Sequence, residues 1–553
     1  MIESLIESWP EELGDPRDQH RSASDWVYVD GIDVTRFRSV SLGKTFLRTT
    51  SLYRLHLRRM RVALDRMCRR YRPRMITLVD LRSRHGLFRA ETKRRLVEHV
   101  CHNHGIAFDD RLDEVGPDDP LIAEQPVGVA APLIERSARR YFRQVYERFV
   151  ETLFSARTWI GERRSFVYFQ LNWAALAPIL DAKLPGRCAP LLIAGSLPKG
   201  LGRLARAWVR GFNLVALPSA KLDTGDQAAL ARIREDLERA WCAPDDFDGE
   251  CLRAFVRDVI LDSGWLRLRA LEAKRYQALF ERHSIRHLVV GDATNPLCRL
   301  LLDLARAHNI PGDELLNGMF LSPHRHEARV GTMGELPVLG RLLSRGALDE
   351  RWLAKTGASC PFVRTGYPAI RSRRPGSLRF DGRGRALVLP FYADSDDSRA
   401  CGHQIIDLLV ETLHVLAERH LKAIRIKLHI GPPNEPYYRR VAEEVGVDAE
   451  VVKDNSLAKH IAWADFIVGP INSGAWLEAM AAGKPYFPFC PTPSLIEPTL
   501  LPEGTTVLRQ AEQLRAHLDS GICPDIGRPL EDIVSAYSIG DPAQAVWRAV
   551  EAI

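Results

Sequence analysis

Short runs of apolar residues alternate with amphipathic stretches along most of this chain. The apolar runs have the length and the side-chain types of strands. The stretches between them, such as 401–421, repeat apolar residues at helical spacing. Strands are predicted at 75–81, 166–171, 189–195, 213–219, 286–292 and 314–320, and again at 385–392, 424–430, 449–454, 464–469, 484–489 and 505–508. Strands that alternate with helices in this way are typical of parallel α/β domains.

The alternation is interrupted between 364 and 385, where Pro, Gly and Arg are frequent and apolar residues are few. Such a composition predicts a linker. At 553 residues the chain is also too long for a single core. We therefore predict two doubly wound α/β domains, at 75–365 and 366–541. A helical basic region at 1–74 precedes them, and a helix at 542–553 is expected to pack back on the first domain.

The composition is that of an ordinary soluble protein, with 46% hydrophobic and 27% charged residues. The ten cysteines are scattered without a CxxC pair, which indicates reduced thiols. The first residues, MIESLIESWPEELGD, are acidic and do not resemble a secretory signal. No uncharged apolar run approaches the ~18–20 residues that span a bilayer. The expected location is the cytoplasm, with peripheral attachment to the inner membrane face as an option.

Positive charge is concentrated near the N-terminus. Between Arg36 and Arg95 there are 19 Lys or Arg residues and three acidic residues. The densest part, Arg54 to Arg74, also holds Leu55, Val62, Leu64 and Met67. A basic amphipathic helix of this kind favours an anionic membrane surface, and a solvated helix face is the alternative. Nucleic acid is not an expected partner, because no recognised binding module accompanies the charge.

The segment 464–489, ADFIVGPINSGAWLEAMAAGKPYFPF, predicts strand, loop, helix and strand. Ser473 and Gly474 stand at the predicted start of the helix, where free N–H groups and a partial positive charge suit a phosphate. Glu478 follows one turn later and can accept hydrogen bonds from a ribose diol. The alternative is a simple N-cap followed by an ordinary surface glutamate.

This segment resembles the donor-side segment of GT-B glycosyltransferases. Residues 424–438, IRIKLHIGPPNEPYY, resemble the K-x-H-P segment of bacterial surface-polysaccharide transferases and of CDP-glycerol-using wall transferases. Residues 285–318 resemble the acceptor-domain strand, helix, G-I-P and H-G sequence, and 360–370 resemble the T-G-x-P strand. The four matches occur in the family's order. The resemblance implies GT-B architecture, in which two Rossmann-like domains face a cleft.

The resemblance also implies a donor site on the C-terminal domain. The residues expected to bind the nucleotide-sugar are Lys427, His429, Asn472, Ser473, Gly474 and Glu478. Three positions depart from the family pattern. Where the family has His-Pro, this chain has His429-Ile430, and where the family has His-Gly it has Asn317-Gly318. The family's pair of Ser residues is replaced by Asn472-Ser473.

An inverting transferase needs a base that takes the proton of the acceptor hydroxyl. Asp292 directly follows a predicted strand and is the first candidate, although it is also suited to capping the next helix. His324, His326 and Glu327 are further candidates for the base or for binding phosphate. Neither these three nor the acidic group Asp394, Asp396 and Asp397 predicts a metal site. No metal or other cofactor is expected.

Taken together, the residues and the resemblance predict a glycosyltransferase that moves a sugar from a nucleotide-sugar to a glycan or lipid-linked acceptor in bacterial surface-polysaccharide or lipopolysaccharide synthesis. One alternative is transfer of a polyol phosphate from a CDP-alcohol. Another is a non-catalytic GT-B-like protein that binds a nucleotide or a partner, which the departures at Asn317 and Ile430 favour.

Overall fold

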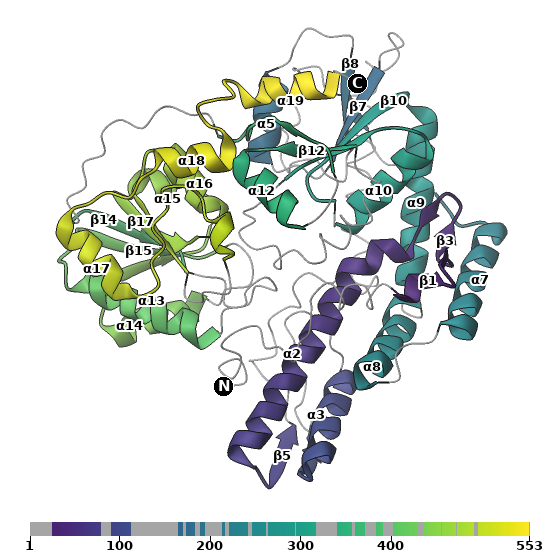
Figure 1. The fold of residues 1–553 in the computed structure, drawn as a ribbon, viewed down its shortest axis with the longest axis horizontal. Helices are drawn as coiled ribbons and strands as arrows, with labels where there is room; N and C mark the ends of the chain where they lie inside the picture. The colour runs from purple at the N-terminus through teal and green to yellow at the C-terminus, as the bar shows by residue number, and fades with distance from the viewer. Residues whose placement is uncertain are drawn as a thin grey trace.

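Two separate parallel sheets organise the computed structural model, and a helical arm extends from the first of them (Figure 1). The structure describes residues 25–78, 90–111, 164–169, 173–182, 188–193, 209, 213–215, 220–241, 246–261, 264–293, 295–316, 340–356, 360–370, 383–390, 402–429, 435–454, 456–471, 473–490 and 496–551. Within these residues, no helix has the length and apolar character that crossing a membrane requires.

The first sheet has seven parallel strands in the order β13-β12-β11-β10-β7-β8-β9. Their bounds are β7 Arg164–Phe169, β8 Cys188–Ile193, β9 Asn213–Val215, β10 Ile285–Val290, β11 Gly312–Leu315, β12 Arg341–Ser344 and β13 Phe362–Arg364. The chain moves outward from β7 to β9, returns to the other side of β7 with β10, and then moves outward again. Strand β11 is buried at every position, as expected of a parallel sheet covered on both faces.

Helices on the two faces cover this sheet. They are α5 Trp173–Asp181, α9 Trp265–Arg282, α10 Pro296–Ala307 and α12 Ala347–Thr356, whereas α7 Thr224–Ala240 packs against α9 and β3. Helix α10 shows why the sequence folds this way locally. Asn295 is its N-cap and accepts a hydrogen bond from the N–H of Leu297 (3.0 Å), and Pro296 occupies the first helical position, where its missing N–H costs nothing.

The second sheet has five parallel strands in the order β16-β15-β14-β17-β18. Their bounds are β14 Arg385–Val388, β15 Ala423–Lys427, β16 Ala449–Val452, β17 Phe466–Pro470 and β18 Tyr486–Phe489. Here the strand order reverses between β14 and β17. Helices α13 Gly402–Ala417, α14 Glu435–Val445 and α17 Ala511–Ser520 lie together on one side, and α15 Leu457–Trp463 and α16 Gly474–Ala481 lie together on the other (Figure 1).

These two sheets confirm the predicted fold class of two doubly wound α/β domains. Strand β12 is too short and polar to have been predicted among the strands, whereas β13 lies within 360–370, the segment that resembles the T-G-x-P strand. The run 505–508 does not form a strand, because Leu508 makes only an isolated bridge to Phe489. The run 75–81 contributes β5 Met75–Leu78, which pairs only with β6 Ala107–Asp110 in a two-stranded sheet outside the two main ones.

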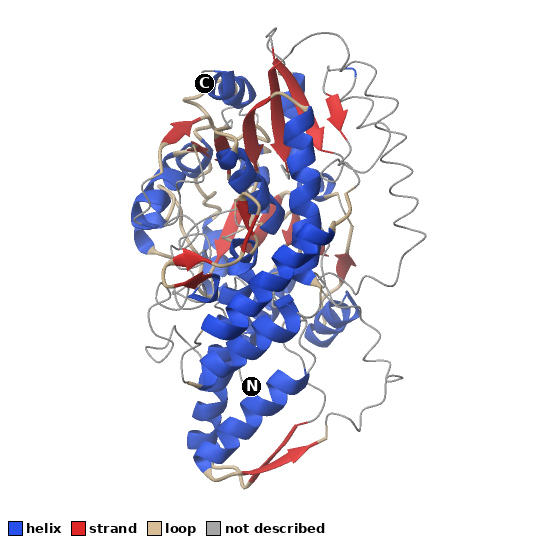
Figure 2. Cartoon of the chain, turned by 90° about the vertical axis from the view of Figure 1, so that its right-hand side faces the viewer, coloured by secondary structure: helices blue, strands red, loops and turns tan. Residues whose placement is uncertain are grey.

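The arm consists of α2 Leu47–Tyr71, α3 Ala90–His104, β5 and β6, with α8 Phe247–Phe255 and a π-helical turn Val256–Leu261 alongside (Figures 1 and 2). Smaller elements near its base are η3 Asp25–Val27, β1 Tyr28–Val29, β2 Ile32–Asp33, β3 Arg36–Phe37, β4 Val40–Ser41 and η4 Gly43–Phe46. With 25 residues, α2 is about 37 Å long.

The predicted lipid-facing surface of α2 is wrong for most of the helix. Val62 and Leu64 are buried in the core, and Arg54 is buried as well. Arg58 and Arg61 form ion pairs with the buried carboxylate of Asp248 on α8, at 2.8 and 3.1 Å. These side chains hold the arm together and are not available to a membrane.

The C-terminal helices connect the two halves of the chain. They are α18 Gly527–Val534 and α19 Pro542–Glu551, preceded by a 3-10 turn, Pro498–Leu500. Trp547 of α19 donates a hydrogen bond from its indole N–H to the carbonyl of Ile179 on α5 (2.8 Å). Arg341 of β12 donates to the carbonyl of Ala549 (2.7 Å). Helix α19 therefore packs on the domain built around the first sheet.

Candidate functional site

The strand order of an open parallel sheet indicates where a ligand fits. Where the order reverses, the helices after the two central strands leave on opposite faces and open a crevice beyond the carboxyl ends. In the second sheet this point lies between β14 and β17, where Val388 pairs with Val468. A pocket opens here, lined by Leu389 and Pro390 after β14, Gly469 in β17, Phe489 in β18 and one face of α13.

Close packing under this edge fixes the loop that follows β17. A Cβ atom at Gly469 would lie 2.5 Å from Oη of Tyr486 and 2.9 Å from Cβ of Leu389, so only glycine fits. The fully buried Tyr486 donates its hydroxyl hydrogen to the carbonyl of Pro470 (2.9 Å). Burial raises the pKa of this phenol well above its usual value, so the group remains a donor. The loop is thereby held at the point where α16 begins.

The first residues of α16 leave two hydrogen-bond donors at an open surface. Ser473 is the N-cap, and its Oγ accepts a hydrogen bond from the N–H of Ala475 (3.2 Å). Because that bond uses a lone pair, the hydroxyl hydrogen remains available to a ligand. The N–H of Trp476 bonds to the carbonyl of Ser473 (3.1 Å), whereas the N–H of Gly474 has no partner in the part of the chain that is described. A Cβ at Gly474 would have no neighbour within 4 Å.

Glu478 shares the exposed side of α16 with Gly474. The residues between and around them, Ala475, Trp476, Leu477, Ala479 and Met480, are buried, so the exposed positions are spaced four apart. Because helical side chains lean toward the N-terminus, the carboxylate of Glu478 points back toward Gly474. Glu478 is exposed as a residue, yet the surrounding protein desolvates its carboxyl group enough to raise its pKa above the usual value.

The end of β15 is the second part of the predicted donor site. Lys427 is buried, and its amino group donates to the carbonyls of Leu428 (2.6 Å) and Asp454 (2.7 Å). Burial lowers the pKa of Lys427, and the charge of Asp454 opposes that effect. His429 lies at the surface beyond the strand. Partial desolvation, and then the Lys427 cation, lower its pKa, which favours a neutral imidazole at pH 7.

Lys427 has a structural role besides the predicted one, which stays a prediction. Two of its three N–H donors tie the end of β15 to the loop after β16, so its main contribution is to hold those loops. His429 is exposed beyond the carboxyl end of β15, and its predicted contact with the donor stays a prediction.

Asp292 lies at the corresponding point of the first sheet, where the strand order reverses between β7 and β10. It is half-buried and is the second residue after β10. The helix cap is Asn295, not Asp292, so the capping interpretation of Asp292 is wrong. The next residue, Ala293, donates its N–H to the buried carboxylate of Glu314 on β11 (3.1 Å). Glu314 thus fixes the loop that carries Asp292, a role that the sequence did not reveal.

The carboxyl edge of the first sheet contacts the second domain through residues that follow β12 and β13. Arg345 and Asp349 form a fully buried ion pair (2.6 Å), and Arg345 also lies 5.8 Å from the ring centre of Tyr367. A Cβ at Gly346 would lie 2.6 to 2.8 Å from backbone atoms of α18. Close backbone contact of this kind requires glycine.

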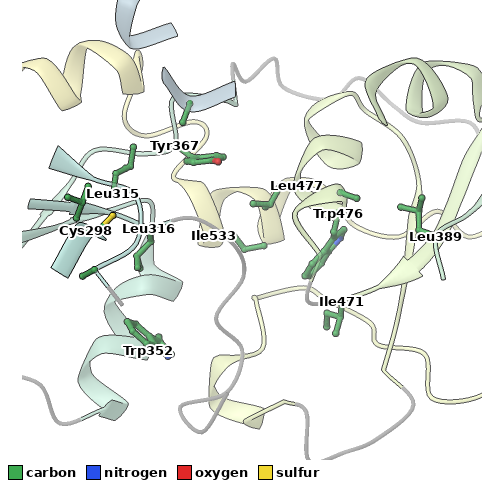
Figure 3. Packing of buried hydrophobic residues seen from close by; sticks show 14 of the residues in the cluster. Cys298, Leu315, Leu316, Trp352, Tyr367, Leu389, Ile471, Trp476, Leu477 and Ile533 are labelled. Atoms are coloured by element: carbon green, nitrogen blue, oxygen red, sulfur yellow. The ribbon is translucent and has the colours of Figure 1, made fainter. Parts of the chain in front are cut away.

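Helix α18 lies between the two halves. Arg351 of α12 donates two hydrogen bonds to Asp532 of α18, at 2.7 and 2.6 Å. Figure 3 shows Ile533 of α18 between Trp352 on one side and Trp476 on the other. Burial is the main cause of the raised pKa of Tyr367; Arg345 opposes it, and the charge of Glu478 adds to it. Glu478 therefore lies on the side of α16 that faces the first domain.

Several predicted residues lie outside the described part of the chain. These are Asn472, His324, His326 and Glu327, together with Asn317, Ile430 and the acidic group at 394–397. The described residues contain no group of three His, Cys, Asp or Glu side chains that could hold a metal ion. What the structure brings together is Ser473, Gly474 and Glu478 on α16, beside the carboxyl end of the second sheet.

No protein-family model matches the chain, and a search of curated proteins finds no match. Similar solved structures include the UDP-GlcNAc 2-epimerase of Neisseria meningitidis bound to UDP-GlcNAc (11% identity, TM-score 0.43, covering 71% of this chain and 100% of that one). The lipopolysaccharide outer core galactosyltransferase WaaB in its apo form is similar at 9% identity and a TM-score of 0.39, over 71% of this chain and 99% of that one. Acinetobacter baumannii MurG has 9% identity and a TM-score of 0.37, over 71% and 100%.

Similarities at these TM-scores carry no argument about family or activity. The strand order of the two sheets defines the fold.

Proposed function

We propose that this protein is a GT-B type glycosyltransferase that moves a sugar from a nucleotide-sugar donor to a glycan or lipid-linked acceptor in bacterial surface-polysaccharide synthesis. The observation that carries the proposal is the start of α16. There the Gly474 N–H and the Ser473 hydroxyl hydrogen have no acceptor among the described residues, and Gly474 is exposed, at the edge where the second sheet reverses its strand order.

A nucleoside diphosphate fits these features. Its phosphates carry negative charge that the N-terminus of a helix stabilises, and its oxygens accept hydrogen bonds from the two free donors. The adjacent Glu478 carboxylate can accept hydrogen bonds from the two hydroxyl groups of a ribose.

In the proposed reaction the acceptor hydroxyl oxygen attacks the anomeric carbon of the donor sugar. As that C–O bond forms, the bond from the anomeric carbon to the donor phosphate breaks, and the nucleoside diphosphate leaves. Asp292 takes the proton of the acceptor hydroxyl. The N-terminus of α16 stabilises the charge that develops on the leaving phosphate. The products are the extended acceptor and the nucleotide, with inversion at the anomeric carbon.

A non-catalytic nucleotide-binding protein is the second candidate, and one observation favours it. The amino group of Lys427, which the resemblance assigns to the leaving nucleotide, already bonds to two backbone carbonyls. Such a protein would share the donor site but would not transfer the sugar.

A thermal-shift panel tests the proposal with CMP, CDP, UDP, GDP and dTDP. A ligand that binds only the folded state stabilises it by about 2.7 kcal/mol at 100 times its Kd. We expect one nucleotide to raise Tm, and we expect Glu478→Ala to abolish that rise while leaving the apo Tm nearly unchanged, because the residue is exposed.

Glu443→Ala is the matched control, since Glu443 is an exposed glutamate on α14 in the same domain. It should retain the full nucleotide shift. If no nucleotide raises Tm, or if Glu478→Ala shifts as the wild type does, the proposed donor site is wrong. If nucleotides bind but no donor sugar is turned over, the non-catalytic candidate is favoured.

A further inference from the structure

The far end of the helical arm carries an exposed surface that the proposed chemistry does not use. It consists of Arg69, Arg70, Tyr71, Arg72, Arg74 and Met75, which we call the arm tip. All six residues are exposed. The tip lies where α2 ends and β5 begins, at the lower end of the molecule and away from both large sheets in two perpendicular views (Figures 1 and 2).

The arm tip has an apolar component that packing does not explain. Tyr71 is 56% exposed and Met75 is 54% exposed, whereas most large apolar side chains of the described residues are buried. In β5 the side chains alternate, so that Leu78 is buried and Ile76 half-buried while Met75 and Thr77 face outward. Met75 therefore lies on the solvent side of a two-stranded sheet, where a polar residue would be expected.

Within the part of the chain that the structure describes, no acidic side chain pairs with the positive charges of the tip. Among the described residues, none of the four tip arginines forms an ion pair, and Arg70 instead lies over the ring of Tyr71 at 5.4 Å. The acidic side chains of β6 are already bound, since Asp109 pairs with Arg111 (2.8 Å) and Asp110 with Arg94 (2.6 Å). These arginines contrast with Arg58 and Arg61, which are bound to Asp248 inside the arm.

The backbone holds this surface in one arrangement. Arg72 ends α2 in the left-handed conformation (φ 44°), and its N–H bonds to the carbonyl of Cys68 (2.9 Å). Two residues later, the carbonyl of Arg74 accepts a hydrogen bond from the N–H of Ala107 (3.1 Å). The turn is thus tied both to the helix and to β6, so little entropy is lost when the tip binds a partner.

We propose that the arm tip docks the protein on an anionic lipid bilayer. The arginines attract the negatively charged headgroups, and Tyr71 and Met75 enter the interfacial region, where an amphipathic ring and a flexible thioether are stabilised. A polyanion such as a nucleic acid would use the arginines but would leave Met75 in water, and so the apolar pair favours lipid. The inference does not depend on the proposed reaction.

Vesicle co-sedimentation tests the proposal on the full chain, with phosphatidylcholine vesicles that contain or lack phosphatidylglycerol. We expect binding only when the anionic lipid is present. Binding should be strong at ~0.1 M salt and lost at ~1 M, because the Debye length falls from ~10 Å to ~3 Å. Binding that ignores lipid charge, or no binding to the anionic vesicles, would overturn the proposal.

A matched pair of variants locates the surface. In the first, Arg69, Arg70, Arg72 and Arg74 are changed to Gln. In the second, the same substitution is made at four exposed arginines on α7, α9 and α10, namely Arg232, Arg267, Arg282 and Arg306. Each basic residue near an anionic surface contributes about fivefold, so the loss of four should lower the partitioning of the first variant by nearly three orders of magnitude. The second changes the net charge equally and should bind as the wild type does. Equal losses in both variants would mean that only total charge matters.

The apolar component has its own test, with Tyr71→Ser and Met75→Ser made together. We expect at least a fivefold loss of binding to anionic vesicles, and none for the control pair Tyr437→Ser and Ile522→Ser, whose side chains are similarly exposed elsewhere. The lipid proposal fails if the double variant Tyr71→Ser and Met75→Ser binds vesicles as the wild type does. It also fails if soluble heparin binds the wild type while vesicles do not, and in both cases the tip is a polyanion site. Unchanged Tm and nucleotide shift in every variant separate this result from the donor site.

Discussion

Replacing Gly474 by proline should separate nucleotide binding from folding, because the residue's N–H has no partner in the described part of the chain. Gly474 is the first residue of α16, a position where proline is favoured. Its φ is not in the left-handed region, and a Cβ there meets nothing within 4 Å. The preceding Ser473 has φ −96° and ψ 138°, which is the conformation that a residue before proline adopts.

The apo protein should therefore keep its stability. Where glycine already has a compatible conformation, proline restricts the unfolded chain and stabilises the fold by about 0.4–1 kcal/mol. Binding should respond differently. A hydrogen bond to a charged phosphate contributes about 1.5–3 kcal/mol, so its loss should raise the nucleotide Kd roughly 10- to 150-fold.

Gly474→Ala is the matched control, because it adds a Cβ but keeps the N–H. The assay is isothermal titration calorimetry with whichever nucleotide gives the largest thermal shift. We expect the alanine variant to bind much more tightly than the proline variant, with both as stable as the wild type. Equal affinities for the two variants would show that the Gly474 N–H does not contact the phosphate, and the argument from α16 would fail.

Two further predictions test other parts of the structure. Asp292→Asn keeps the shape of the side chain but cannot take a proton, so turnover should fall by about 10²- to 10⁴-fold while nucleotide binding is retained; activity within a few-fold of the wild type would place the base elsewhere. Burial raises the pKa of Cys251 to about 12 and that of Cys360 to about 11, so at pH 8 both remain thiols. Mass spectrometry after iodoacetamide treatment should find both unmodified in the folded protein and modified after unfolding, and rapid alkylation of the native protein would contradict their burial.

The local pattern of the sequence was sufficient for much of the second domain. Each of β14 to β18 lies within or beside a predicted apolar run, because a strand in a parallel sheet is buried on both faces and reads as continuously apolar. The start of α16 was also predictable. Ser473 caps the helix that follows, since its side chain satisfies an N–H group of the first turn, and this is a local interaction.

The tertiary structure decided which partners the charged side chains of these local patterns bind. Lys427 and Arg58 are both cations that the sequence offers to a ligand or a membrane. Besides its bond to the neighbouring carbonyl of Leu428, Lys427 bonds to the carbonyl of Asp454, and Arg58 bonds to Asp248, because the fold brings these distant groups within reach. A pattern of charges cannot reveal which of its members are neutralised by long-range partners.

The arm tip is a second case in which the sequence did not reveal which side chains are exposed. The sequence predicted a basic amphipathic helix at Arg54 to Arg74. It did not predict which face of that helix is exposed to solvent. Packing against α3 and α8 buries Val62 and Leu64 of the apolar stripe that the sequence assigned to the membrane, and among the α2 side chains that the structure describes, the exposed ones lie in the last turn. Residue types and helical spacing are properties of the chain, whereas exposure depends on which elements the fold brings against each face.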